Sequence, residues 1–243
     1  MTVHPIDRVP AWSLAVVAML SVQLGAAISV GLFDEVGVAG TAWLRLTFGA
    51  LGFVLLARPR YWQWSWRELR APILLGVVSG GMTLSFLAAI SLLPLGTVVA
   101  IEFLGPLTVA ALHSSTRRSL AWPGLALVGV VLLTEPWQGD LNLLGIALAA
   151  VAAVGWALYI VITQHVGDRF QGVDGLAISL PVAAVLCAVV GLPQAWGHIT
   201  LPVLLVALAA AVLLPLIPWT FELYALRRLT KSAFGTLMAL EPA

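Results

Sequence analysis

Long hydrophobic runs, interrupted at intervals by charged residues, prolines and glycines, occupy nearly the whole chain. A membrane-spanning helix needs about 20 mostly apolar residues, with a working range of roughly 17–25. Eight runs reach or approach this length, and a ninth begins near residue 232. The eight runs are 12–32, 38–57, 72–93, 95–112, 120–134, 141–163, 174–192 and 201–221. The pattern predicts an all-α membrane protein with nine spans, the last of them incomplete.

Composition supports this interpretation and excludes other classes of protein. Hydrophobic residues make up 61% of the chain and charged residues 9%, whereas about 25% are charged in an ordinary soluble domain. The formal net charge is +1, so no strong field favours a nucleic acid or an acidic partner. Cys187 is the single cysteine, which rules out a disulfide framework and a cysteine-based metal site.

The basic residues predict the orientation of the spans. If the N-terminus is cytoplasmic and every run crosses the membrane, 11 of the 12 Lys and Arg residues fall in inner loops, and the twelfth, Arg45, lies within a span. The predicted outer loops contain Asp34, Glu35, Glu135 and Asp140 and no Lys or Arg. Because cytoplasmic loops are enriched in Lys and Arg, we expect a multi-pass protein of the inner membrane with a cytoplasmic N-terminus.

The two halves of the chain resemble each other. Shifting the sequence by 136 residues places 84–107 over 220–243 without gaps, so that Leu87 meets Leu223 and Pro106 meets Pro242. Five spans in each half is an odd number, which requires the halves to be inverted relative to one another. The pattern predicts a first repeat over residues 1–134, with spans 1–5, and a second over 135–243, with spans 6–9.

The ninth run ends before it is long enough to cross a bilayer. Residues 232–243 give about 18 Å of helix, against a hydrocarbon core of about 30 Å. We expect the sequence to be a truncated version of a ten-span protein, cut before span 10. A natural nine-span protein is the alternative.

Four stretches point to a known family. They are SVQLGAAISVGLFDEVG (21–37), TAWLRLTFGAL (41–51), PLGTVVAIEFLGPLTVAAL (94–112) and FGTLMALEPA (234–243). With the repeat, they resemble the EamA family of the drug/metabolite transporter superfamily, and within it the threonine/homoserine exporter group. The resemblance implies a ten-helix carrier with two inverted five-helix halves. It also implies alternating-access export of small amino acids or related metabolites, coupled to the proton gradient. Export of other metabolites or drugs is the alternative.

Ionisable residues within predicted spans are the candidates for the transport pathway, because burying them costs at least about 2.5–3.5 kcal/mol each. Arg45 and Glu102 each lie seven residues from the predicted outer start of a span, which places them at one depth, roughly 10 Å below the surface. Two interpretations remain open. The residues form a structural ion pair, or Glu102 titrates or binds an amine while Arg45 binds a carboxylate.

Other polar residues within spans are weaker candidates. Glu241, beside Pro242, is either a second polar site or a structural residue, and Gln23 is a candidate substrate contact because a buried amide needs partners. Pro106 and Pro242 each remove a backbone donor, which favours a kink over a cavity-lining carbonyl. Glu222, near Arg227 and Arg228, favours a structural salt bridge.

The remaining chemistry argues against other functions. The four histidines are scattered without ligand spacing, so we expect no metal, no cofactor and no catalytic residues. A membrane-embedded enzyme needs paired acidic residues or a Ser/His set, and an ion channel needs rings of charge or carbonyls. The expected partners are a small-molecule substrate and the lipid bilayer, with no nucleic acid. The oligomeric state is open, and a homodimer is one option.

Overall fold

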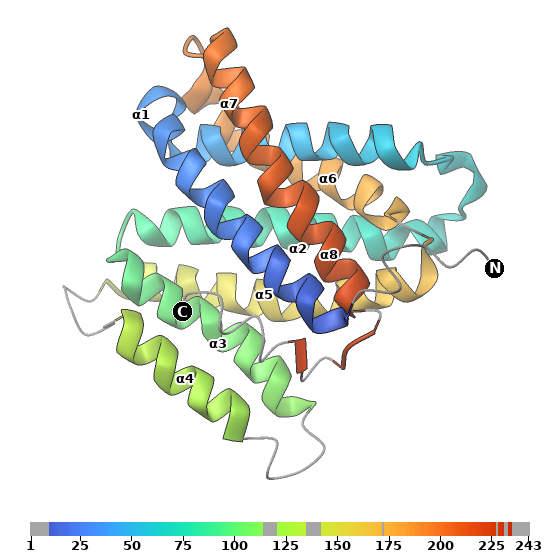
Figure 1. The fold of residues 1–243 in the computed structure, drawn as a ribbon. Helices are drawn as coiled ribbons and strands as arrows, with labels where there is room; N and C mark the ends of the chain where they lie inside the picture. The colour runs from blue at the N-terminus through green and yellow to red at the C-terminus, as the bar shows by residue number, and fades with distance from the viewer. Residues whose placement is uncertain are drawn as a thin grey trace.

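The computed structural model describes residues 10–113, 121–134, 142–171, 173–226, 228–230 and 233–234. Within these residues the regular elements are helices, arranged side by side as a bundle (Figure 1). They are α1 (Ala11–Ala57), η2 (Tyr61–Gln63), α2 (Trp66–Ile90), α3 (Leu95–Leu112), α4 (Ala121–Thr134), α5 (Leu143–Arg169), α6 (Asp174–Ala195), α7 (Leu201–Ala211), η3 (Val212–Leu216) and α8 (Ile217–Leu226).

Among the described residues, six helical segments are long and apolar enough to cross a membrane. They are Trp12–Ala57, Trp66–Ile90, Leu95–Leu112, Leu143–Arg169, Asp174–Ala195 and Leu201–Leu226. The all-α membrane architecture is therefore confirmed. The predicted runs 12–32 and 38–57 lie together in α1, and 120–134 corresponds to α4, a helix of only 14 residues. Most of the predicted ninth run lies outside the described residues.

A bend divides α1 into two arms. Gly37 has φ 72° and ψ 170°, a conformation that glycine adopts readily because it has no Cβ. Figure 1 shows α1 turning back on itself, and a hydrogen bond from Arg45 to Ser29 joins the two arms. The predicted break between the first two runs is thus a helical hairpin rather than an extended loop.

Helix ends differ from the predicted runs by up to six residues, and two of these differences, in α2 and α5, are the largest. α2 begins six residues before the expected start, because Ser65 and Glu68 form a capping box in which the Ser65 amide donates to Glu68 Oε2 at 2.7 Å. Such a box satisfies two donors that a helix N-terminus otherwise leaves unpaired. α5 continues to Arg169 rather than ending at residue 163, so this helix extends past its apolar run.

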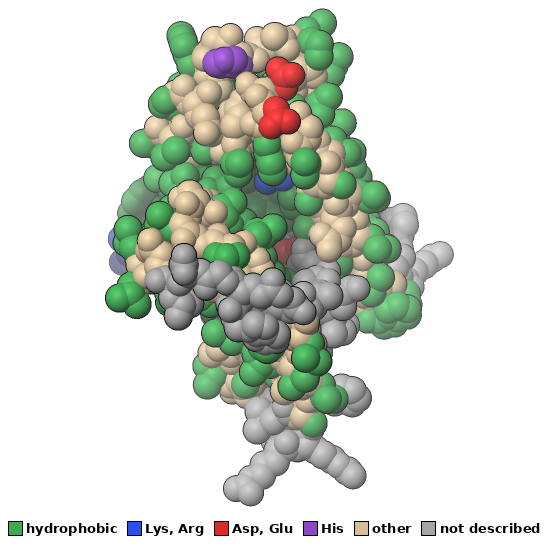
Figure 2. All heavy atoms as spheres, turned by 90° about the vertical axis from the view of Figure 1, so that its left-hand side faces the viewer, with side chains coloured by type: hydrophobic (Ala, Val, Ile, Leu, Met, Phe, Trp, Pro, Cys, Tyr) green, Lys and Arg blue, Asp and Glu red, His purple; other side chains and the backbone are tan. Residues whose placement is uncertain are grey.

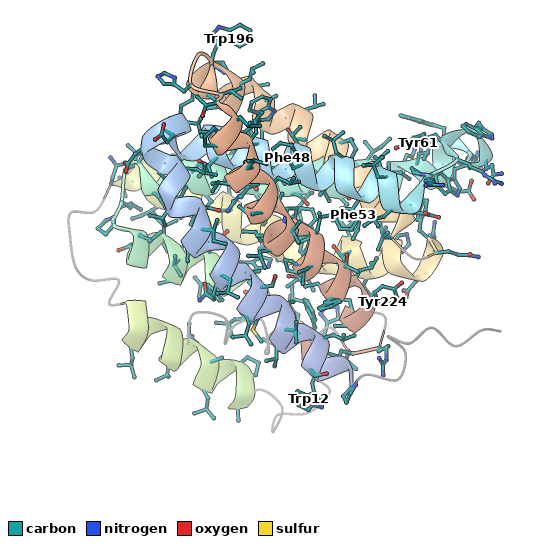
Figure 3. All side chains as sticks on the ribbon, turned by 45° about the horizontal axis from the view of Figure 1, so that its top comes forward. Trp12, Phe48, Phe53, Tyr61, Trp196 and Tyr224 are labelled. Atoms are coloured by element: carbon teal, nitrogen blue, oxygen red, sulfur yellow. The ribbon has the colours of Figure 1, made fainter. Side chains whose placement is uncertain are left out.

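The bundle has two recognisable ends. The bend end carries Gly37 and the α6–α7 turn, and the basic end carries Arg58, Arg60 and Arg169. Large aromatic side chains are exposed at both, as for Trp196 (73%) and Trp62 (81%). Figure 3 shows Trp196 at the bend end and Tyr61 at the basic end. Aromatic residues at helix ends are typical of membrane–water interfaces.

Buried apolar residues separate into clusters at different levels. The bend-end cluster joins α1, α6 and α7 through Leu32, Val36, Leu44, Ala195, Val203 and Ala207. The main cluster, with Phe53, Leu75, Leu180, Leu223 and Leu226 among its members, joins α1, α2, α5, α6 and α8. The helices of the two halves therefore pack against each other at both levels.

Glycines allow close approach where helices cross. A Cβ on Gly76 of α2 would meet the Ser179 backbone oxygen of α6, and a Cβ on Gly80 would lie 3.2 Å from Ala183 Cα. Small residues at such crossings let helices in a membrane gain van der Waals contact. Gly81, on the same helix, has nothing within 4 Å of an added Cβ.

The α2–α6 crossing yields a test of this packing. We expect Gly76→Ala to lower stability by about 1–3 kcal/mol, because the added methyl group overpacks the contact with backbone. Gly81→Ala is the matched control on the same helix, and we expect it to leave the melting temperature unchanged or raise it, since alanine favours helix. Thermal unfolding of the detergent-purified variants measures both. Equal melting temperatures for the two variants would contradict the close crossing.

Candidate functional site

The last described membrane segment is broken near its middle. Between α7 and α8, η3 is a π-helical stretch, and Leu214 leaves the helical conformation with φ −158° and ψ 101°. Ser21 Oγ on α1 donates a hydrogen bond to the Leu213 carbonyl at 2.7 Å. Irregular backbone inside a membrane is tolerated only where protein or water covers it, and π-bulges are frequent at functional sites.

Glycines of both α1 arms admit this broken segment. Added Cβ atoms would lie 2.8 Å from the Leu214 Cβ at Gly25, 2.6 Å from the Pro215 Cγ at Gly49, and 2.8 Å from the Leu216 Cδ1 at Gly52. A Cβ at any of these positions would require the broken segment or its side chains to shift. Both arms of α1 therefore pack closely against the midpoint of the α7–α8 segment.

Arg45 lies on the second arm of α1, one helical turn before Gly49, and is half-buried. Its Nη1 donates to Ser29 Oγ at 3.0 Å, and Ser29 Oγ in turn donates to the Gly25 carbonyl at 2.6 Å. Its Nε is buried and has no hydrogen-bond partner. The guanidinium is thus held from one side and retains capacity to bind an acceptor.

Glu102 is half-buried on α3, one turn before Gly105 and Pro106. That helix lies close against α5, because a Cβ on Gly105 would meet the Ala153 backbone oxygen, and Phe103 packs edge-on against Trp156 with ring centroids 4.8 Å apart. Of the two interpretations left open for Arg45 and Glu102, the structural ion pair is not observed among the described residues, where Arg45 donates to Ser29. Matched depth in the sequence does not bring the two charges into contact.

Figure 2 views the bend end of the bundle and shows a hollow between the helices. A Lys or Arg side chain lies on its wall and an Asp or Glu side chain at its floor, surrounded by apolar atoms. An apolar cavity with a few polar groups is the usual form of a small-molecule site.

A polar contact fixes the bend of α1 at the rim of this end. Gln194 Oε1 on α6 accepts hydrogen bonds from the Ala39 amide at 2.8 Å and the Gly40 amide at 3.0 Å. These amides begin the second arm of α1, where a helix otherwise leaves donors unpaired. Gln194 therefore acts as an N-terminal cap supplied by another helix, which sequence reasoning did not identify.

The structure also assigns Glu222 a partner that was not expected. Tyr159 Oη on α5 donates to Glu222 Oε2 at 2.7 Å, and Glu222 is 4% exposed. We expected a salt bridge to Arg227 or Arg228, but Arg227 lies outside the described residues and Arg228 is exposed. Tyr159 and Glu222 are 63 residues apart, so no local pattern in the sequence indicates the pairing.

The other sequence candidates have different outcomes. Gln23 is exposed on α1, and Pro106 is buried within α3, which runs without interruption from Leu95 to Leu112. Glu241 and Pro242 lie outside the described residues. In the part of the chain that the structure describes, no group of three or more His, Cys, Asp or Glu side chains is placed to hold a metal ion.

Comparison with known proteins identifies the family of the chain. A model of the EamA-like transporter family matches residues 143–243. The threonine/homoserine exporter RhtA of Escherichia coli strain K12 is 37% identical over 246 residues, covering 97% of this chain and 82% of that protein. The chain belongs to the EamA-like transporter family.

Further relatives agree with this family. RhtA of Salmonella typhimurium strain LT2 is 36% identical over 97% of this chain and 82% of its own length. One solved crystal structure, described only as that of a protein, has a TM-score of 0.73 at 20% identity, over 96% of this chain and 84% of that one. The structural match shows a shared fold. Because the curated relatives of this EamA-family chain are exporters, the prediction of a transporter rather than an enzyme is confirmed.

Proposed function

We propose that this EamA-family chain exports small amino acids of the threonine and homoserine type, or related metabolites, from the cytoplasm by proton-coupled alternating access. The observation that carries the proposal is the hollow at the bend end, which holds a basic and an acidic side chain among apolar atoms, in a bundle whose α7–α8 segment is interrupted. The similarity of the chain to the RhtA exporters, at 36–37% identity, supports the substrate class. A zwitterion offers one carboxylate and one ammonium, and the pathway offers one guanidinium and carboxylates.

Two inverted five-helix halves are part of the proposal, and the arrangement of helices supports them. A shift of 136 residues carries α2 (Trp66–Ile90) onto 202–226, the α7–α8 segment, and the second arm of α1 (38–57) onto 174–193, within α6. The contacts between helices repeat in the same way. The contact of α1 with α7 and α8 corresponds to the contact of α5 with α2. The contact of α2 with α6 corresponds to the contact of α8 with α1. Discontinuous helices at a repeat interface are a common substrate site in such carriers.

The charges support an N-terminus inside and the bend end outside. In the described residues, Arg58, Arg60, Arg67, Arg70 and Arg169 lie at the basic end, whereas Asp34 and Glu35 directly precede the bend at Gly37. Cytoplasmic loops carry the excess of Lys and Arg, so the hollow opens toward the outer face. The structure then corresponds to the state of an exporter that releases substrate outside.

A labelling experiment tests this orientation in the inner membrane. We expect a membrane-impermeant maleimide to label Asp34→Cys in spheroplasts, and to label Arg60→Cys only after lysis. The native Cys187 is 1% exposed, so the parent chain is the unlabelled control. The reverse pattern would place the N-terminus outside.

A growth and transport assay tests the substrate class. In a strain sensitive to threonine or homoserine, expression of the chain is expected to confer resistance. Proteoliposomes should accumulate either amino acid when a proton gradient drives the transport. Accumulation of other metabolites or drugs, without resistance to threonine or homoserine, would contradict the proposed substrate class and favour an exporter of those other compounds.

Variants of the pathway residues test the substrate contacts. We expect Arg45→Gln to raise the KM for threonine at least about tenfold, because a charge-assisted hydrogen bond of about 1.5–3 kcal/mol is lost. Glu102→Gln is expected to have a similar effect through the ammonium group. Arg169→Gln, at the exposed basic end, is the charge control. If both pathway variants have the wild-type KM, Arg45 and Glu102 do not contact the substrate.

A further inference from the structure

The carboxyl group of Glu222 is buried in an apolar part of the membrane bundle. The residue is 4% exposed on α8, next to Leu223 (1% exposed) in the main hydrophobic cluster. The hydrogen bond from Tyr159 Oη, at 2.7 Å, is the polar contact that the structure gives it. An ionised carboxylate at such a place is costly, and ionisable residues within membrane spans commonly serve ion or proton movement.

The groups around Glu222 leave this carboxyl without a described cation. Tyr159 is 3% exposed on α5, with its ring against Trp219 at a centroid distance of 5.5 Å. The other titratable groups on α5 are exposed toward its end, namely His165, Asp168 and Arg169. On α1, Arg45 bonds to Ser29 and Arg58 is exposed. On α8 itself the other titratable group is Tyr224, and η3 has none.

An unpartnered hydroxyl lies one helical turn from Tyr159. Thr163 on α5 is 0% exposed, and its Oγ1 has no hydrogen-bond partner. A buried polar atom without a partner normally costs free energy, and spacing of four residues puts it on the same face of α5 as Tyr159. Gln164 Nε2 of α5 also donates to the Leu226 carbonyl of α8 at 3.2 Å. This side of α5 therefore carries a phenol bonded to a buried carboxyl, an amide bonded to backbone, and a buried hydroxyl without a hydrogen-bond partner.

Glu222 lies at a different level from the proposed substrate contacts. It follows Pro215 by seven residues, about 10 Å further along the segment toward the basic end. Arg45 lies one turn from Gly49, which packs on Pro215, and on the other side of the break. The interrupted stretch of the α7–α8 segment thus lies between the two levels.

We infer that Glu222 is the carboxyl that binds the coupling proton, and that Tyr159 is its positioning donor. The inference rests on the proposed proton-coupled export and names the residue that carries out the coupling. A hydronium ion reaching Glu222 from the outer side gives up its proton, so that an O–H bond forms on the carboxylate and water is left. When the basic end opens to the cytoplasm, this O–H bond breaks and the proton passes to water there.

The burial of Glu222 explains why its proton would control the opening. A neutral carboxyl, hydrogen-bonded to Tyr159, is compatible with the closed main cluster, whereas the ionised form needs water. The closed cluster therefore retains the neutral carboxyl, and opening of the basic end to water allows the proton to leave. The charge state of one side chain thus biases the two states that alternating access requires.

The test separates substrate movement from proton coupling in proteoliposomes of the full chain. In Glu222→Gln, a neutral isostere that still accepts the Tyr159 hydrogen bond, we expect threonine counterflow to continue while accumulation driven by a pH gradient is lost. Asp168→Asn, at the exposed end of α5, is the control and should keep both activities. Accumulation retained in Glu222→Gln overturns the inference. Loss of counterflow in a monodisperse, folded Glu222→Gln also overturns it, because the residue would then bind substrate.

Tyr159→Phe provides a second variant. We expect it to retain accumulation with the pH of half-maximal transport moved upward, since the charged carboxylate has lost a hydrogen-bond donor. An unchanged pH profile overturns the positioning role. Infrared difference spectra between low and high pH add a readout that needs no substrate: the protonated carboxyl band should disappear in Glu222→Gln and persist in Asp168→Asn. Wild-type protein that shows this band but no threonine counterflow would refute the proposed function and leave the proton site standing.

Discussion

Backbone hydrogen bonding in a hydrocarbon environment is the constraint on which this structure depends. Without water, every amide and carbonyl in a span must find a partner inside the protein, and a helix supplies nearly all of them. The consequences appear wherever a helix is interrupted. At the α1 bend, Gln194 accepts from two amides of the new helical arm, and at the α7–α8 break, Ser21 donates to a carbonyl. Each interruption is therefore matched by a polar side chain from a distant helix.

These interruptions also bring the two halves of the chain together. Gly25, Gly49 and Gly52 admit the broken segment between the arms of α1, and Gly191 of α6 has no room for a side chain beside Trp43. In a bilayer, apolar contact alone gives little preference for protein over lipid, so close packing of small residues and interhelical hydrogen bonds carry the association.

The fold was largely predictable from hydrophobic patterning, and the candidate site was predictable only in part. Runs of apolar residues located α3 at its observed bounds, 95–112, and α6 within three residues, because span length in a membrane is a physical requirement. The pattern missed the early start of α2, which depends on Ser65 and Glu68, a local capping interaction that hydropathy does not register. Scarcity of charge singled out Arg45 and Glu102, but depth along two helices does not determine which faces meet.

The contacts that were missed share a physical cause. Tyr159 with Glu222, Gln194 with Ala39, and Ser21 with Leu213 join residues between 63 and 192 positions apart. No periodicity within a single helix encodes such pairs, because they depend on the rotation of each helix about its axis and on where a neighbour crosses it. The sequence indicates that a buried polar residue needs a partner, and the packing of the bundle determines which one.

The hydrogen bonds that Gln194 accepts from the α1 bend have a consequence for biogenesis. They join residues 154 and 155 positions apart in the chain, so α1 leaves the ribosome long before its cap has been synthesised. Until α6 arrives, the Ala39 and Gly40 amides must be solvated by water or lipid headgroups at the membrane surface. The bend is therefore completed late, when the second half of the protein docks. Insertion of the first hairpin and its final folding are consequently separate events in the life of this chain.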